Sequence, residues 1–265
     1  MYQAMPFDSV AADYDRSFTM SAIGRRMRAA VWNRLDDTFR PGERVLELNC
    51  GTGEDAVHLA QQGVRVLATD ISPGMLTMTR AKVERAGVAN LVEVAQLPIE
   101  DLAELGPRGP FDGVLSNFGG LNCVADLPGV ARTLAALVRP GGRAVLCVMG
   151  PAVPWEWGWY LAHGQPRKAL RRLRPGGAVW RELTVRYPSI GAVRGAFSPH
   201  FRQRRVAAIG ALVPPSYAEA WAARHPRLLA GLDHLERRIE TWPPLPWLAD
   251  HYLIELERSN DGGLG

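Results

Sequence analysis

The sequence predicts an α/β fold in which a mostly parallel, doubly wound sheet carries helices on both faces. Between residues 41 and 150, short apolar runs alternate with helical patterns of roughly 10 to 15 residues, which is typical of βαβ units. The runs are apolar throughout, as expected for strands that are covered on both faces. The 265 residues are 47% hydrophobic and 22% charged, so one large domain with an ordinary core is expected.

The elements of the first half follow from apolar spacing and turn residues. A helix is expected over 21–38, and Pro41-Gly42 ends it. Ser72 is expected to cap the third helix, with Pro73 in its first position. The predicted strands are 44–48, 64–69, 91–95, 111–116 and 143–149, and the predicted helices between them are 54–62, 73–86 and 130–138.

The composition changes after Gly150, and residues 151–177 are rich in Trp, Pro and Arg. Strands are expected at 182–186, 203–212 and 251–257, helices at 189–196 and 217–239, and a frayed tail at 259–265. We therefore expect three parts: a helical cap (1–40), a cofactor-binding core (41–150), and lid insertions with the last strands of the same sheet (151–265).

Charge and cysteine content limit the setting of the protein. The net charge is +4 and the pI is near 9.2, which is too mildly basic to indicate a nucleic-acid partner. There is no run of about 18 apolar residues and no secretory signal pattern at the start, so no membrane-spanning helix is expected. Three scattered cysteines form no CxxC pair and no metal spacing, which predicts a cytoplasmic protein without a metal site.

The strongest local pattern is a strand that runs into a glycine turn, Val45 to Gly53. Glycines let a ligand approach the backbone, and the helix start offers free N–H groups. Asp70 ends the next strand, 17 residues after Gly53, where an acid accepts hydrogen bonds from ribose hydroxyls. Glu54-Asp55 at the helix start would repel a pyrophosphate. The pattern therefore favours S-adenosylmethionine, which carries an ammonium, a sulfonium and no phosphate; a dinucleotide or an empty site is the alternative.

These residues resemble the ordered motifs of class I S-adenosylmethionine-dependent methyltransferases, of the ubiquinone/menaquinone type. Glu47–Gly53 is similar to the first motif of that family and Asp70–Leu76 to the second. Further similar segments are Phe111–Val114 with Ser116-Asn117, Leu137–Gly142, and an N-terminal segment with Phe7, Ala12, Tyr14 and Asp15. The resemblance implies a Rossmann-like fold with a seven-stranded sheet and lid insertions.

The resemblance also implies which residues bind the cofactor. Glu47 and the 49–53 turn would lie along the methionine part, Asp70 would hold the ribose, and Tyr14 would cover the ligand. Gln96 and Leu97, after the third strand, would flank the adenine edge. Asn49 replaces the usual first glycine, and Asn tolerates a positive φ better than most residues. The full set is Tyr14, Glu47, Asn49, Cys50, Gly51, Gly53, Asp70, Ile71, Met75, Gln96, Leu97, Asn117 and Phe118.

Sulfonium methyl transfer is an in-line displacement, so alignment and exclusion of water are the main tasks of the enzyme. A hydroxyl or ammonium acceptor also needs a base. The candidates are His163, His200 and Tyr160, and His251 at the start of the last strand is a further one.

The second half is expected to cover the acceptor. Trp155, Trp157 and Trp159, together with Asn122, are the predicted acceptor contacts. Alternatively, this aromatic segment is a lid helix packed on the sheet edge, or an element that lies at a membrane interface. The basic run from Arg167 to Arg174 is either a solvated helix face or a site for an anionic substrate or membrane surface. The helix within 214–250 either packs on the core or forms a homodimer contact.

The predicted function is methyl transfer from S-adenosylmethionine to an oxygen, nitrogen or carbon of a small molecule, aromatic or lipophilic. RNA or protein methylation is an alternative. However, Ser116-Asn117-Phe118-Gly119 stands where an Asn/Asp-Pro-Pro-Tyr tetrad would indicate methylation of amino groups on bases or glutamine. A non-catalytic protein that binds the cofactor is the other alternative.

Overall fold

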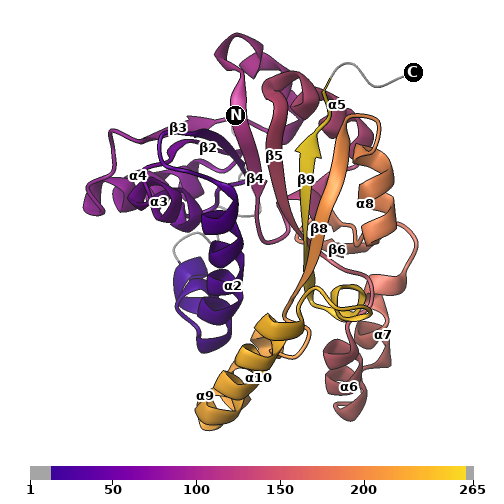
Figure 1. Cartoon of the computed structure of the whole chain (residues 1–265). Coiled ribbons are helices and arrows are strands. Elements are labelled where there is room, and N and C mark those ends of the chain that lie inside the picture. Colours follow the sequence, from indigo (N-terminus) through magenta and orange to yellow (C-terminus); the bar gives the residue numbers. More distant parts are fainter. Residues whose placement is uncertain (1–12, 261–265) are drawn as a thin grey trace.

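A seven-stranded sheet forms the centre of the molecule (Figure 1). The computed structural model describes residues 13–260. The strand order is β3-β2-β1-β4-β5-β9-β8; neighbours among β1 to β5 are parallel, and β9 is antiparallel to both β5 and β8. This confirms the predicted fold class. The strands are β1 (Arg44–Leu48), β2 (Arg65–Asp70), β3 (Val92–Gln96), β4 (Phe111–Ser116), β5 (Val138–Met149), β8 (Phe201–Ile209) and β9 (His251–Arg258).

Helices cover both faces of the sheet, and each face has its own apolar core. One core joins the sheet to α2 (Ala22–Thr38), α3 (Glu54–Gln61) and α4 (Pro73–Arg85). The other joins it to the 3-10 segment η2 (Ile99–Arg108), α5 (Leu127–Leu137) and α8 (Ile190–Phe197). Since the helices pack on opposite faces, the sheet is doubly wound, and the carboxyl ends of its parallel strands meet at one edge.

Local capping chemistry places the helix starts. The Ser72 side chain accepts a hydrogen bond from the Met75 amide, and Pro73 opens α4, as predicted. Asp126 caps α5 in the same way through the Gly129 amide, so this helix begins at Leu127, three residues before the prediction.

The second half departs from the predicted elements in two strands. The expected strand at 182–186 is half of a separate hairpin, β6 (Ala178–Trp180) with β7 (Leu183–Val185). The strand expected to reach residue 212 ends at Ile209, because Gly210 has φ +75° and the Glu236 carboxylate accepts the amides of Gly210, Leu212 and Val213.

The long helix expected at 217–239 is two helices, α9 (Glu219–Arg224) and α10 (Pro226–Ile239). A 3-10 turn, η5 (Ser216–Ala218), precedes α9. Pro226 lacks an amide hydrogen and disfavours the helical conformation at His225, which has φ −128° and ψ 53°. Proline therefore ends one helix and begins the next.

The remaining short elements lie around the carboxyl edge. They are η1 (Asp15–Thr19), η3 (Gly120–Cys123), α6 (Pro154–Ala162), α7 (Pro166–Ala169), η4 (Arg171–Leu173) and η6 (Leu245–Leu248). Within residues 13–260, none of the helices combines the length and the apolar character needed to cross a bilayer. Phe7 and Ala12 of the predicted N-terminal segment lie outside the described residues.

Candidate functional site

A cavity of about 720 Å³ lies at the carboxyl edge of the sheet, beside the ends of β1, β2 and β4. Strand order reverses between β1 and β4, which is where ligands bind in open α/β sheets. Nine of the thirteen predicted cofactor residues line this cavity: Tyr14, Asn49, Cys50, Gly51, Asp70, Ile71, Met75, Asn117 and Phe118.

The glycine turn after β1 uses its two glycines differently. Asn49 has φ 53°, which confirms that it takes the left-handed conformation in place of a glycine. A Cβ on Gly51 would meet no heavy atom within 4 Å, so this backbone faces the open cavity. A Cβ on Gly53 would lie 2.5 Å from Thr79 Cγ2 on α4. The prediction that Gly53 contacts a ligand is therefore corrected, because Gly53 is required by helix packing instead.

Asp70 joins the turn after β1 to the turn after β2. Its Oδ2 accepts the Gly51 amide at 2.9 Å, and its Oδ1 accepts the Ser72 amide at 2.9 Å. The side chain lines the cavity while almost fully buried. A rigid carboxylate at this position suits a pair of ribose hydroxyls.

The predicted adenine residues lie beside the cavity. The Gln96 amide donates to the Ile71 carbonyl, and Leu97 is buried in the second core. Neither is among the lining residues of the described chain; Ile99 and Glu100, at the start of η2, line it instead. The 3-10 segment η2 that brings Ile99 and Glu100 to the cavity was not predicted from the sequence.

Buried charges behind the glycine turn form a network that the sequence analysis missed. Asp55 accepts hydrogen bonds from Arg28 Nη1 at 2.8 Å, Trp32 Nε1 at 2.7 Å and Asn117 Nδ2 at 2.8 Å. Burial alone would raise the pKa of Asp55, but the Arg28 charge and these bonds outweigh it and lower the pKa. Arg28 also lies 5.0 Å from the Phe118 ring centroid and lines the cavity. The only signal for it in the sequence was its place beside the apolar stripe of the first helix.

The acidic pair at the start of α3 is neutralised within the protein. Asp55 pairs with Arg28, and Glu54 lies within 2.5 Å of Lys82 Nζ. The reasoning that these two charges themselves attract a cationic ligand therefore needs correction. Repulsion of a ligand phosphate is weakened for the same reason.

Two other polar atoms near the turn have unused hydrogen-bonding capacity. Glu47 Oε2 and Asn49 Oδ1 are buried without a hydrogen-bond partner among residues 13–260. Burial, followed by the nearby Asp55 charge, raises the pKa of Glu47 well above its ordinary value. Buried acceptors without partners are uncommon, and a cationic group with N–H donors would satisfy them. These two acceptors fit the ammonium at the methionine end of S-adenosylmethionine.

The segment before α2 closes over the turn. Asp15 Oδ1 accepts from Thr52 Oγ1 at 2.7 Å, and its Oδ2 lies 2.7 Å from Lys82 Nζ. Tyr14, one residue earlier, lines the cavity, and burial raises the pKa of its hydroxyl. These contacts hold Tyr14 over the predicted cofactor position.

The far end of the cavity is apolar. Its walls include Phe118, Met149 at the end of β5, and the hairpin residues Val179, Trp180 and Leu183. Phe118 has φ +44°, a conformation that a bulky residue adopts rarely and that indicates a constrained position. A cation, Arg171, and a phenol, Tyr187, also line this end.

The predicted acceptor residues lie elsewhere in the described chain. Trp155 donates to the Leu212 carbonyl, and Trp159 packs on Tyr217 at 5.5 Å between ring centroids, so both join α6 to the η5–α9 region. Trp157 is on α6, outside the cavity lining. Trp155 and Trp159 instead line a separate open groove, together with His163.

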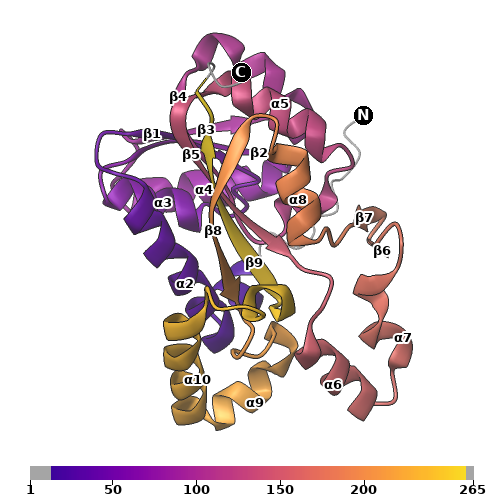
Figure 2. The same cartoon turned by 45° about the vertical axis from the view of Figure 1, so that its right-hand side comes forward.

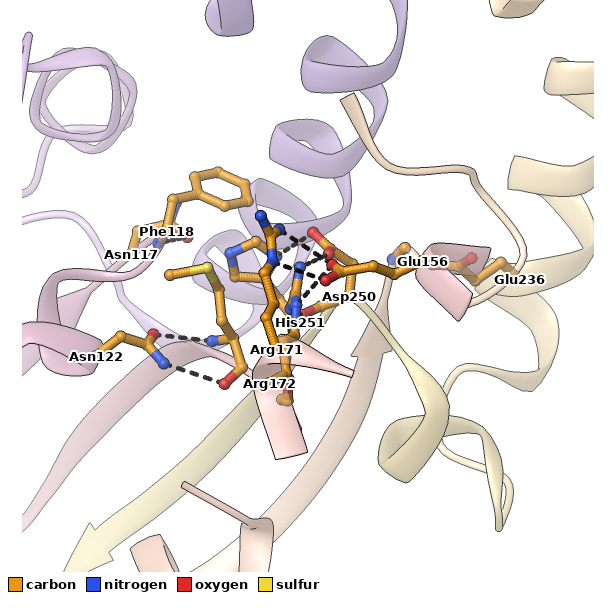
Figure 3. A network of polar contacts seen from close by, with 12 residues as sticks. Asn117, Phe118, Asn122, Glu156, Arg171, Arg172, Glu236, Asp250 and His251 are labelled. Carbon is orange, nitrogen blue, oxygen red and sulfur yellow. Dashed lines mark hydrogen bonds and ion pairs between the residues drawn. The ribbon is translucent and has the colours of Figure 1, made fainter. Parts of the chain in front are cut away.

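Asn122 has a structural role. Its Nδ2 donates to the Met149 carbonyl, and its Oδ1 accepts the Met149 amide (Figure 3). The Nδ2 also donates to the Arg186 carbonyl. The side chain is fully buried, so its amide is committed to the backbone on both sides. Trp180, which the structure places in the cavity wall, was missed because the sequence analysis predicted a strand only at 182–186 and no hairpin.

The predicted bases are also distributed differently. His200 precedes β8 at the amino edge of the sheet, opposite the cavity, because β8 runs parallel to β1. His163 stacks on Trp159 and Tyr160 packs on Tyr217, and neither lines the cavity in the part of the chain described. His251 is not among the described lining residues either, but its ring packs edge-on against the lining residue Phe118, at 5.3 Å between centroids.

A chain of buried charges extends from His251 to the cavity wall (Figure 3). His251 Nδ1 lies 2.9 Å from Asp250 Oδ2, and Arg172 Nη2 lies 2.5 Å from Asp250 Oδ1. Arg172 Nε donates to Glu156 at 2.8 Å, and Glu156 also pairs with Arg171 at 2.8 Å. Burial opposes the charge on Asp250, yet Arg172 and His251 lower its pKa. The network therefore holds Arg171 against the cavity.

Comparison with known proteins identifies the core. Residues 45–142 match the family model described as a methyltransferase domain. A demethylmenaquinone methyltransferase from Beutenbergia cavernae is 36% identical over 162 residues, which cover 58% of this chain and 62% of that protein. The chain thus spans less than two thirds of the length of this curated relative.

Solved structures extend the likeness to the whole fold. The CcbJ methyltransferase from Streptomyces caelestis has a TM-score of 0.63 and 17% identity, covering 98% of this chain and 100% of that chain. An S-adenosylmethionine-dependent methyltransferase from Mesorhizobium loti has a TM-score of 0.55 and 19% identity, covering 86% and 98%. At these identities the likeness shows the fold alone.

Proposed function

Residues 45–142 of this chain form a class I methyltransferase domain, and on that premise we propose that the chain transfers the methyl group of S-adenosylmethionine to a lipophilic small molecule. The observation that carries the proposal is the cavity itself. It joins the backbone turn at Asn49–Thr52 and the Asp70 carboxylate to an apolar chamber at Phe118 and Met149. The cavity therefore offers a nucleoside and a lipophilic acceptor adjoining binding sites.

Different residues would bind different parts of the cofactor. Asp70 would accept bonds from the ribose hydroxyls, and Ile71 with Ile99 would pack on the adenine. Arg28, which lines the cavity, would meet the methionine carboxylate. Glu47 and Asn49 would accept from the ammonium, because their buried oxygens have spare acceptor capacity. Enclosure by Tyr14 would exclude water from the reacting carbon.

The acceptor we propose is aromatic and apolar, of the quinone type. The relatives named as demethylmenaquinone methyltransferases support this class, and so do the apolar walls of the chamber. Arg171 would orient a hydroxyl or its anion. Where the acceptor must lose a proton, we place the base at His251, whose ring is fixed by Asp250 and Phe118.

Calorimetric titration with S-adenosylmethionine and S-adenosylhomocysteine tests the cofactor site. A second assay would supply methyl-labelled cofactor with reduced naphthoquinones, catechols and amines, and detect labelled product by mass spectrometry. We expect micromolar binding and a labelled quinol. Binding without product from any acceptor would support the non-catalytic alternative, and label in added tRNA or protein would support a macromolecular substrate.

Other expectations remain proposals. They are a cytoplasmic location, a homodimer, the absence of a nucleic-acid partner, contact with a membrane surface, and the division into parts at residues 40 and 150.

A further inference from the structure

Exposed apolar side chains are concentrated in one segment beside the cavity. Ten large hydrophobic residues are exposed in the described chain, and five of them lie between residues 161 and 180, with 41% to 76% of their surface accessible. These five are Leu161, Leu170, Leu173, Val179 and Trp180. Single exposed apolar residues are ordinary, but a cluster of this kind marks an interaction surface.

The same segment is strongly basic. Residues 157–181 contain six of the 31 basic residues of the chain and none of its 27 acidic residues, so the rest of the chain carries a net charge of −2. Two of the six, Arg171 and Arg172, are paired with Glu156. The other four are exposed: Arg167, Lys168, Arg174 and Arg181.

This segment, which we call the basic apolar segment (residues 157–181), also borders the cavity. Its hairpin strand β6 contributes Val179 and Trp180 to the cavity wall, and Arg171 contributes a cation. In Figure 2, the β6–β7 hairpin, α7 and α6 follow one another down the right-hand side of the molecule, away from α3. A surface bound to this side would therefore meet the walls of the acceptor chamber.

We propose that the basic apolar segment docks on the surface of an anionic lipid bilayer. Leu and Trp side chains enter the interfacial layer of a bilayer, while Arg and Lys attract anionic headgroups. The expectation that a lipophilic acceptor passes from the bilayer into the cavity rests on the proposed function, but the docking itself does not.

Charge and apolarity together favour a bilayer over the other occupants. A nucleic acid would be matched by the basic residues but would leave Leu161, Leu170 and Leu173 against phosphates and water. A second copy related by a two-fold axis would bring two acid-free basic segments together and repel. A bilayer with anionic lipid satisfies both properties at once.

Flotation with liposomes tests the proposal. We expect the full chain to bind vesicles of 70% phosphatidylcholine and 30% phosphatidylglycerol, to bind pure phosphatidylcholine at least tenfold more weakly, and to lose binding as salt is raised. The variant R167Q/K168Q/R174Q should lose tenfold or more in partitioning, because each basic residue near an anionic surface contributes about fivefold. L170Q/L173Q should weaken binding to the anionic vesicles as well.

The control removes the same charge from other helices. R80Q/R85Q/R132Q changes three exposed arginines on α4 and α5, and it should keep vesicle binding within about threefold. Circular dichroism and cofactor titration of each variant separate a lost surface from a lost fold. Equal losses in the two triple variants, no preference for anionic vesicles, or capture of an RNA oligonucleotide in place of vesicles would overturn the proposal.

The two proposals fail separately. Cofactor binding and transfer to a water-soluble acceptor are measured without lipid. If the protein binds the cofactor and methylates the water-soluble acceptor but does not float with liposomes, the docking surface is wrong and the proposed function stands. If the protein binds vesicles but does not bind the cofactor, the docking surface stands and the proposed function is wrong.

Discussion

The two halves of the cavity are built in different ways. On the cofactor side, the cradle that lines the cavity is made of short turns that follow adjacent strands, as where Asp70 accepts the amides of Gly51 and Ser72. On the acceptor side, the wall is held by charges far apart in the chain, as where Arg172 meets Asp250, 78 residues later. The first construction depends on local motifs, and the second depends on tertiary folding.

This difference explains which side chains are expected to be sensitive. A backbone cradle tolerates changes around it provided that its glycines and one acid remain. A buried ion-pair network does not tolerate loss of a single member, because the remaining charges stay buried without a partner. The comparison therefore predicts stability effects for the buried ion pairs and affinity effects for the backbone cradle.

The largest effect is expected for Arg172→Met. Removing this cation leaves the buried carboxylates of Glu156 and Asp250 with too little compensation, which should lower the free energy of unfolding by about 3–5 kcal/mol. Urea denaturation measures the change. The matched control is Arg202→Met, since Arg202 is exposed and pairs with Glu257 at 3.3 Å, so about 0–1 kcal/mol is expected. Similar losses in the two variants would show that burial does not set how much an ion pair contributes to stability.

Asp70→Ala should act on affinity. We expect at least a tenfold loss in binding of S-adenosylmethionine, equivalent to about 1.4 kcal/mol, because ribose bonds and the support of the Gly51 turn are both lost. Calorimetric titration measures it, with Asp37→Ala on the exposed end of α2 as the control. Unchanged affinity in Asp70→Ala would show that the ribose lies elsewhere.

Trp180→Ala and Trp157→Ala test which aromatic side chain meets the acceptor. Trp180 lines the cavity, so its loss should raise the acceptor KM by up to about tenfold while the cofactor Kd stays nearly constant. Trp157 lies outside the lining, and its loss should leave both constants within about twofold. The reverse pattern would restore the acceptor site predicted from the sequence. Steady-state kinetics with the quinol acceptor measures both.

The smallest effect is a pH dependence at Asp55. The pKa of its carboxyl is lowered in the folded state, so its ionised form stabilises the fold above the unfolded value of about 3.9, and this contribution is lost as pH falls further. Asp55→Asn should therefore be less stable at pH 6 and should lose less stability than the wild type between about pH 4 and 2.5. Urea midpoints across this range measure it, and parallel pH curves would contradict the assignment.

Much of the cofactor side could be predicted because its signals are local. Asn49 was expected to accept a positive φ, Ser72 was expected to cap α4, and both are confirmed. Gln96 was predicted to line the cavity, but Ile99 lines it instead, because the 3-10 segment that begins at Ile99 had no clear periodicity. Gly53 was assigned to the ligand because spacing alone does not distinguish a glycine that faces a cavity from one that packs on a helix.

The acceptor side could not be predicted residue by residue. Three tryptophans near residue 157 suggested an aromatic wall, yet Trp155 and Trp159 pack against η5 and α9. His200 was a candidate base until strand direction placed it at the opposite edge of the sheet. Composition shows that such side chains exist, but not which way they point.

The sequence by itself determined the order of strands and helices, the glycine turn and the acid that follows it, since periodicity, capping and turn chemistry act between near neighbours. Only the tertiary structure decided that Arg28 enters the cavity, that a hairpin lines it, and that Asp250 closes a buried network with Arg172. Those contacts depend on how distant segments pack, and the free energy that selects them comes from burial and charge pairing across the whole fold.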